Sequence, residues 1–166
     1  YALLNGYNSI VTIDGNNKDD PKLIPSIIRK LTEGYDFVQA SRFIEHGKGI
    51  NTPLQRMLAI RLIHAPMISL SSGFHWTDTT QGFRGYSANL LYSSKLRIFR
   101  PIFSTYELLY YLSVEAPRIG MRCIEVPSSR IYPQGKIPTK ISAFRGNIRM
   151  LLILILSCAG FYRPSK

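Results

Sequence analysis

An acidic residue near the start of the chain follows a strand-like run and precedes a turn. Residues 10–13 (I-V-T-I) favour a buried strand, Asp14 comes directly after them, and Gly15 with the two asparagines behind it predicts a turn. Open α/β sheets bind ligands at the carboxyl ends of their strands. Side-chain oxygens are the ligands that Mg²⁺ and Mn²⁺ prefer. We therefore expect Asp14 and Asn16 to bind such a cation; the alternative is an ordinary strand-to-helix loop.

Polar residues that suit an anionic ligand occur further along the chain. Ser41-Arg42-Phe43 closes a second strand-like run, and residues 77–87 (T-D-T-T-Q-G-F-R-G-Y-S) contain two glycines, which let a backbone pass close to a ligand. Residues 118–149 hold seven basic side chains and one acid, Glu125. This basic segment is either a solvated face or a flexible clamp over an anionic leaving group, since arginine and lysine neutralise phosphate charge.

The composition describes one folded domain with a strongly basic balance. The 166 residues are 45% hydrophobic and 19% charged, which excludes a disordered chain and allows a sizeable core. The formal charge of +11 indicates a polyanionic partner: nucleic acid, an anionic membrane surface or a phosphate-bearing substrate. The two cysteines lack the spacing of a zinc site or a disulfide framework, which favours a reducing compartment.

The elements that must position these residues alternate between strand and helix. A helix over about 20–33, capped by Asp20, joins the strand at 10–13 to a second strand at 37–40. Because such a unit places its strands parallel, we expect an α/β fold with a mostly parallel sheet and flanking helices. The other expected elements are helices over 54–70, from about Ala88 and over 103–115, and a strand over 122–126.

Two helical segments admit two interpretations each. Residues 54–70 are apolar around most of the circumference, so this helix is either deeply buried or touches a membrane, and Pro66 should break or kink it. The last helix, about 141–162, has an apolar run only half as long as a bilayer span of ~20 residues. It is either a core helix or an interfacial one on anionic lipid. Residues 1–7 read as a helix end stopped by Gly6, so we expect further elements upstream.

Five motifs in a fixed order resemble the family 2 glycosyltransferases, especially the dolichyl- and polyprenyl-phosphate mannose and glucose synthases. The resemblance covers about residues 5–142. The motifs are I-D-G-N-N-K-D-D-P, Q-A-S-R-F, T-D-T-T-Q-G-F-R-G-Y-S, Y-E-L-L and R-I-Y-P-Q-G-K-I-P-T-K-I-S. The resemblance implies a Rossmann-like GT-A fold without its first strands. Residues 1–140 would form the partial catalytic domain and 141–166 an amphipathic helix.

The resemblance also implies roles for individual residues. Asp14 matches the first acid of the family's D-x-D metal motif; Asn16 stands where a second acid is usual, and Asp19 or Asp20 could supply the missing charge. Asp78 matches the acid that precedes the family's S-G-F-R-like element, here Q-G-F-R, and is the candidate for the reacting centre. The residues implied to bind substrate are Arg42, Gln81, Arg84, Arg130, Lys136 and Lys140.

The expected reaction is inverting transfer of a sugar from a nucleotide-diphosphate donor to a lipid-phosphate or glycan acceptor, with Mg²⁺ or Mn²⁺ as cofactor. A cation and basic side chains would stabilise the departing diphosphate. Asp78 would be the general base for a hydroxyl acceptor, and an orienting group for a lipid phosphate, which is already nucleophilic. We expect no nucleic-acid partner, a cytoplasmic location at the inner face of the membrane, and leave a homo-oligomer open. The alternatives are a nucleic-acid-binding domain and a nucleotidyltransferase of related fold.

Overall fold

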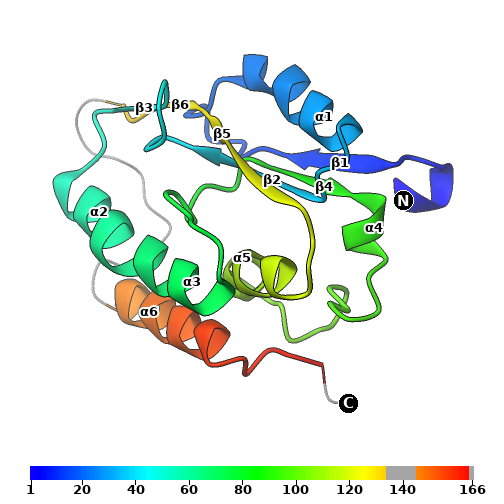
Figure 1. Cartoon of the computed structure of the whole chain (residues 1–166). Helices are drawn as coiled ribbons and strands as arrows, with labels where there is room; N and C mark the ends of the chain where they lie inside the picture. Colours follow the sequence, from blue (N-terminus) through cyan, green and yellow to red (C-terminus); the bar gives the residue numbers. More distant parts are fainter. Residues whose placement is uncertain (134–144, 165–166) are drawn as a thin grey trace.

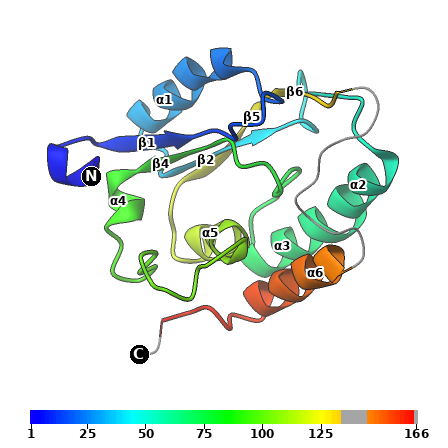
Figure 2. The ribbon, with the colours of Figure 1, turned by 180° about the vertical axis from the view of Figure 1, so that it is seen from behind.

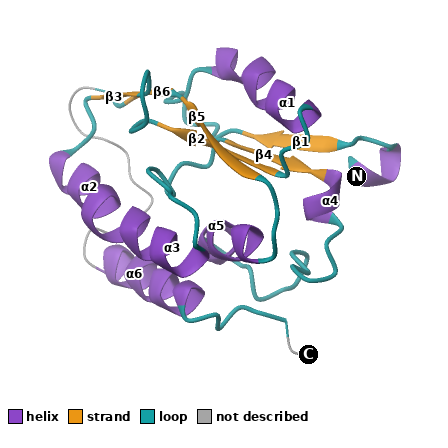
Figure 3. Ribbon diagram, viewed as in Figure 1, coloured by secondary structure: helices purple, strands orange, loops and turns teal. Residues whose placement is uncertain are grey.

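The computed structural model describes residues 1–133 and 145–164, in which helices cover both faces of a central sheet (Figures 1 and 2). Helix α1 covers one face of a central sheet, α5 covers the other, and α3 and α6 lie beyond α5 (Figures 1 and 3). In chain order the elements are η1 (Leu3–Asn5), β1 (Ser9–Thr12), η2 (Pro21–Leu23), α1 (Ile24–Thr32), β2 (Phe37–Ser41), β3 (Lys48–Ile50), α2 (Leu54–Ala59), η3 (Ile60–His64), α3 (Ala65–Ser72), β4 (Arg84–Ser87), α4 (Ala88–Leu91), α5 (Glu107–Arg118), β5 (Cys123–Pro127), β6 (Ser129–Ile131) and α6 (Arg145–Cys158).

The central sheet is mixed, so the expectation of a mostly parallel sheet is wrong although the α/β class is confirmed. Its strand order is β1-β4-β2-β5, in which β4 runs antiparallel to both neighbours and β2 pairs parallel with β5. Strands β1 and β2 are the parallel pair expected from the first strand–helix–strand unit, but β4 separates them. Gly85 of β4 allows α1 to pack closely, because a Cβ there would overlap Ile27 and Leu31.

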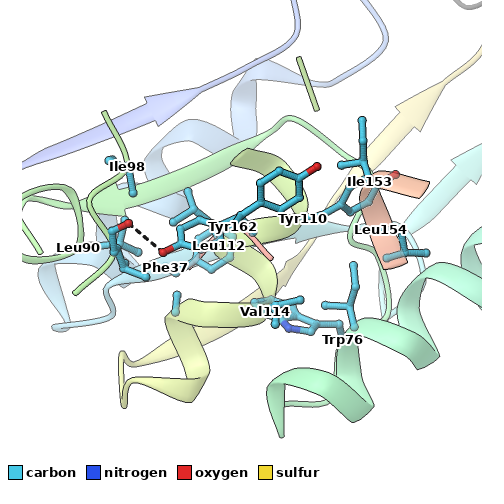
Figure 4. Packing of buried hydrophobic residues seen from close by; sticks show 14 of the residues in the cluster. Phe37, Trp76, Leu90, Ile98, Tyr110, Leu112, Val114, Ile153, Leu154 and Tyr162 are labelled. Carbon is cyan, nitrogen blue, oxygen red and sulfur yellow. Dashed lines mark hydrogen bonds between the residues drawn. The ribbon is translucent and has the colours of Figure 1, made fainter. Parts of the chain in front are cut away.

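Alternate residues of the strands supply two hydrophobic clusters, one on each face of the sheet. Between the sheet and α1 lie Ile27, Leu31 and Val38. The larger cluster lies on the α5 side, where Phe37 and Trp76 pack with side chains of α5 and α6 (Figure 4). Helix α6 therefore contributes to the main core through its buried face, and its outer face is solvent-exposed. The interpretation as a core helix is thus confirmed for its buried side, and the interfacial interpretation stays a prediction.

Pro66 does not break the helix that contains it. Instead, α2 and α3 are joined by one π-helical turn, η3, and Pro66 stands at the start of α3. Proline has no N–H to donate and its ring crowds the carbonyl one turn earlier, and a wider π turn relieves this conflict. The helix continues past the proline, and we find its exposed side rich in leucine.

Two further elements were not expected from the sequence. Strands β3 and β6 form a small parallel sheet, with Gly49 opposite Arg130, beside the edge where β2 and β5 end.

Near the N-terminus, η1 is a single turn ended by Gly6 in the left-handed conformation, which confirms Gly6 as a helix stop. Among the described residues, no helix is both long and apolar enough to cross a bilayer.

Candidate active site

Side chains from four separate segments meet at one edge of the central sheet. Strands β1, β2 and β5 end at this edge and β4 begins there, because β4 is antiparallel to its neighbours. The residues just beyond these strand ends are Asp14, Arg42, Ser128 and Gln81. Polar residues therefore gather at the carboxyl edge of this sheet, as expected. The segment before the antiparallel strand β4 contributes to the same edge.

Arg130 connects two acids from the loop that follows β1. Its guanidinium donates to Oδ2 of Asp14 at 3.1 Å and to Oδ2 of Asp19 at 2.5 Å. The two acids differ in their access to solvent: the Asp14 side chain is 40% exposed and that of Asp19 is fully buried. Asp14 is thus the acid that a ligand in solvent can reach, and Asp19 anchors the arginine.

Asp19 also ties this loop to the segment before β4. Gln81 donates from Nε2 to Asp19 Oδ1 at 2.6 Å, and Ser128 donates to the other end of the Gln81 amide at 3.2 Å. Burial raises the pKa of Asp19, and Arg130 and Gln81 oppose that rise. Gln81, which was predicted to bind substrate, is buried. Both ends of its side-chain amide form hydrogen bonds with other residues of the protein.

Arg42 and Asp78 form a buried, two-point ion pair. Nε of Arg42 lies 2.6 Å from Asp78 Oδ2 and Nη2 lies 2.9 Å from Oδ1, with both side chains almost completely excluded from solvent. Burial alone would lower the pKa of Arg42, but the hydrogen bonds and charge of Asp78 raise it. Sequence reasoning had treated these as separate binding and catalytic residues; the structure places them in direct contact.

Tyr132 is a member of the site that sequence reasoning missed. Its hydroxyl accepts hydrogen bonds from Arg42 at 3.0 Å and from Arg56 of α2 at 3.2 Å, and its ring also lies beneath Lys18 and Arg130. Burial would raise the pKa of Tyr132, yet the surrounding arginines lower it. The only sequence signal was its place beside Arg130 in the basic segment.

Glu125 of β5 holds the backbone that carries Asp78. The Glu125 carboxylate accepts from the backbone N–H groups of Thr77 and Asp78 at 2.9–3.1 Å and from the Thr77 hydroxyl at 2.8 Å. Burial raises the pKa of Glu125 to about 7, against the lowering effect of these hydrogen bonds. Glu125 had been noted only as the one acid in a basic segment.

Three predicted residues remain: Arg84, Lys136 and Lys140. Arg84 is fully buried on the α5 side of the sheet, where it donates to the carbonyls of Thr79, Gln81 and Leu109. Arg84 therefore stabilises the segment before β4 from the α5 side of the sheet. Its contact with substrate stays a prediction. Lys136 and Lys140 fall outside the described residues.

The surroundings of Asp14 fit one ligand of a divalent cation. Asp14 is partly exposed, and a Cβ added at Gly82 would lie only 2.5 Å from its Oδ1, so the glycine leaves this oxygen room. Asn16 is exposed, and its Oδ1 accepts from the Lys18 backbone N–H at 3.2 Å, which leaves one lone pair free. Within residues 1–133 and 145–164, no three histidine, cysteine or acidic side chains cluster as a metal site. Water or substrate oxygens would have to complete the coordination.

A pocket among the described residues lies away from this edge. It measures about 460 Å³ and is lined by α4, the residues after it and Met121, where β4 ends and β5 begins. No chemistry-bearing cluster faces it. No model of a known protein family matches the chain, and no curated protein matches its sequence.

Proposed function

We propose that the protein is a metal-dependent inverting glycosyltransferase of the GT-A type, acting at the inner face of a membrane. It would transfer a sugar from a nucleotide-diphosphate donor to a lipid-phosphate or glycan acceptor. The proposal combines the resemblance of five ordered motifs with the physical arrangement of the residues in them.

One observation carries the proposal. Four of the five motifs that resemble family 2 glycosyltransferases, far apart in sequence, contribute to two hydrogen-bonded clusters at the same sheet edge, and the Tyr132 side chain contacts both clusters. Asp14 and Asp19 come from the first motif, Arg42 from the second, Asp78 and Gln81 from the third and Arg130 from the last. The mixed sheet is compatible with a nucleotide-binding α/β fold, in which the ligand lies beyond the strand ends.

The metal proposal assigns the cation to Asp14 and Asn16. A divalent ion bound there supplies positive charge against which a departing diphosphate is stabilised. Arg130 already lies against Asp14 and is 6% exposed, so it contributes a second fixed positive charge at the same place. Such preorganised charge needs no rearrangement as the leaving group becomes negative.

The pairing of Asp78 favours an orienting role over that of a general base. Both of its carboxylate oxygens accept hydrogen bonds from Arg42, and the side chain is inaccessible to solvent. An acid in this state fixes the Arg42 guanidinium rather than taking a proton from a substrate hydroxyl. Of the two acceptor classes, this arrangement favours a phosphate, because a phosphate oxygen is nucleophilic without deprotonation.

The two alternative functions, nucleic-acid binding and nucleotidyl transfer, predict different features. A nucleic-acid-binding domain of the stacking type needs an exposed aromatic platform, whereas helices cover both faces of the central sheet (Figure 1). A nucleotidyltransferase would use the same strand-end acid, but it would release inorganic diphosphate instead of a nucleoside diphosphate. Product identity separates the two enzymes.

The test is transfer from a panel of radiolabelled UDP- and GDP-sugars to polyprenyl phosphate in Mn²⁺ or Mg²⁺, with the released nucleotide identified by chromatography. We expect a nucleoside diphosphate as product, inversion at the anomeric carbon, and loss of transfer in Asp14→Asn of at least about 100-fold. Glu45→Gln is the matched control, since Glu45 is an exposed acid that lies beside His46.

The same preparation is assayed for Mn²⁺ binding by electron paramagnetic resonance, which requires no donor or acceptor. Unchanged transfer in Asp14→Asn, or release of inorganic diphosphate, would overturn the proposal. Mn²⁺ binding that is equal in Asp14→Asn and the wild type would overturn the metal assignment.

A further inference from the structure

Arg130 is held in place by backbone pairing on both edges of its strand. Strand β6 pairs with β3, and on its other edge the Ile131 N–H donates to the Lys18 carbonyl at 2.8 Å. Asp19 and Arg130 also form an isolated antiparallel bridge. The Arg130 side chain is 7% exposed. Its guanidinium therefore keeps a fixed place against the loop that carries Asp14.

The two acids that share this guanidinium differ in what else they can bind. Both oxygens of Asp19 have protein partners, Arg130 and Gln81, and its side chain is fully buried. Asp14 is 40% exposed, and Arg130 contacts its Oδ2 at 3.1 Å. Gly82 leaves room at the other oxygen, Oδ1, since a Cβ there would stand 2.5 Å away. A cation from solvent therefore meets Asp14 at Oδ1, while Oδ2 of the same carboxylate already contacts a guanidinium.

The charges around Asp14 oppose the binding of a divalent cation by the free protein. A guanidinium in contact with one carboxylate oxygen offsets the negative charge of that carboxylate, and it repels a second cation at short range. Asn16, the other expected ligand, is uncharged, and its Oδ1 accepts from the Lys18 backbone N–H. Asp14, Asp19 and Arg130 together carry one net negative charge, two acids against one arginine. Half of the acidic charge belongs to Asp19, which a cation from solvent cannot contact.

We propose that Arg130 acts as an internal counter-ion that weakens divalent-cation binding at Asp14 until a phosphate-bearing ligand binds beside it. A guanidinium has more N–H donors than the two that Arg130 gives to the acids, so it can donate to a phosphate oxygen without leaving either acid. The phosphate charge then compensates the guanidinium, and Asp14 recovers its attraction for the cation. Cation and phosphate therefore bind cooperatively, each raising the affinity for the other.

A lysine in place of Arg130 separates this role from a purely structural one. The inference rests on the assignment of the cation to Asp14 in the proposed function. If Arg130 only anchored the loop through Asp19, a conservative replacement would leave metal affinity unchanged or lower it. Lysine keeps the positive charge but lacks the forked donors that span two acids. The buried Asp19 needs a counter-ion more than the exposed Asp14 does, so Arg130→Lys should release Asp14.

The test is titration with Mn²⁺ followed by electron paramagnetic resonance, which reports free Mn²⁺ and requires no sugar donor or acceptor. We expect Arg130→Lys to bind Mn²⁺ about fivefold more tightly than the wild type, a typical coupling between two sites. Inorganic phosphate, the probe for a phosphate-bearing ligand, should tighten Mn²⁺ binding by the wild type about fivefold and by Arg130→Lys much less. A titration without protein corrects for complexes of Mn²⁺ with phosphate.

Two further variants serve as controls. Arg29→Lys makes the same change on an exposed arginine of α1, which lies 3.9 Å from Glu33, and should bind Mn²⁺ as the wild type does. Asn16→Asp adds an acid to the loop that carries Asp14 and should tighten Mn²⁺ binding with or without phosphate. Circular dichroism checks that each variant is folded. If Arg130→Lys does not fold, the phosphate dependence of the wild type still decides the question.

Two results would overturn the inference and leave the metal assignment intact. With Mn²⁺ binding lost in Asp14→Asn, the first is an affinity of Arg130→Lys for Mn²⁺ that is equal to or weaker than that of the wild type. The second is a wild-type affinity for Mn²⁺ that does not change with phosphate. Equal Mn²⁺ binding in Asp14→Asn and the wild type would instead remove the metal assignment, and the inference with it.

Discussion

The guanidinium of Arg42 and the carboxylate of Asp78 are held together by two hydrogen bonds of 2.6 and 2.9 Å with no access to solvent. Arg42 follows β2 and Asp78 precedes β4, so the pair joins two neighbouring strands at the edge where the other site residues gather. Removing either partner would leave a buried charge without its counter-ion.

Asp78→Asn should therefore destabilise the fold by about 3–5 kcal/mol, because the Arg42 charge stays buried and loses its partner. Urea denaturation followed by circular dichroism measures the change. The double variant Arg42→Met with Asp78→Leu should recover most of this loss, since apolar replacement removes both charges. A double variant as unstable as the single one would show that the pair does not act as a unit.

Glu125 predicts how stability depends on pH. Its pKa is about 7 in the folded protein against an ordinary value of 4.5, so the folded state binds a proton that the unfolded state releases. The stabilisation is complete below pH 4.5 and is lost as pH rises through about 7. Asp19 is shifted in the same direction. Glu125→Gln should remove the contribution of Glu125 to the pH dependence of the unfolding free energy. This contribution amounts to up to about 3 kcal/mol.

The measurement is urea denaturation of wild type and Glu125→Gln across this pH range. Glu33→Gln serves as control, because Glu33 is a surface acid paired with Lys30. Parallel curves for the wild type and Glu125→Gln would contradict the prediction.

Gly82→Ala should disturb Asp14 without unfolding the protein. The new Cβ would stand 2.5 Å from Asp14 Oδ1, the end of a partly exposed side chain that can move away. We expect loss of Mn²⁺ binding and of transfer, with the unfolding free energy changed by less than about 1 kcal/mol. Gly15→Ala is the matched control, in the loop that carries Asp14, because no atom lies within 4 Å of its added Cβ. Equal metal affinity in the two variants would contradict this role of Gly82.

Tyr132→Phe removes the acceptor that Arg42 and Arg56 share. We expect a loss of about 1–3 kcal/mol in stability, because the buried Arg42 donor then has no replacement for the hydroxyl. Tyr92→Phe, on an exposed tyrosine, should have no effect. In a spectrophotometric titration, the wild type should show one tyrosine ionising below the ordinary range that Tyr132→Phe lacks, since nearby arginines lower the Tyr132 pKa.

Short-range sequence patterns predicted the elements that neighbouring residues alone determine. The strand before Asp14 and the helix over about 20–33 follow from apolar residues and the Asp20 cap, and they form as expected. Strand β4 was missed because its R-G-Y-S sequence resembles a loop, and only pairing with two distant strands makes it extended. Propensity carries little information on such non-local pairing.

The same distinction applies to the site. Motif resemblance selected Asp14, Arg42, Asp78, Gln81 and Arg130, and the fold brings these residues to one edge. It did not predict that Arg42 neutralises Asp78 or that Arg130 lies between Asp14 and Asp19, because partner choice depends on burial and side-chain reach. Tyr132 and Glu125 act through contacts with residues more than 40 positions away, for which the sequence offers no signal.

The position of β4 has a consequence for biosynthesis. Since β1 and β2 each pair only with β4 or β5, with Ser9 opposite Ser87, no ladder of the central sheet can form before residue 87 has emerged from the ribosome. The nascent chain must carry two unpaired, aggregation-prone apolar strands for that time. Cells depleted of ribosome-associated chaperones should accumulate this protein in inclusion bodies.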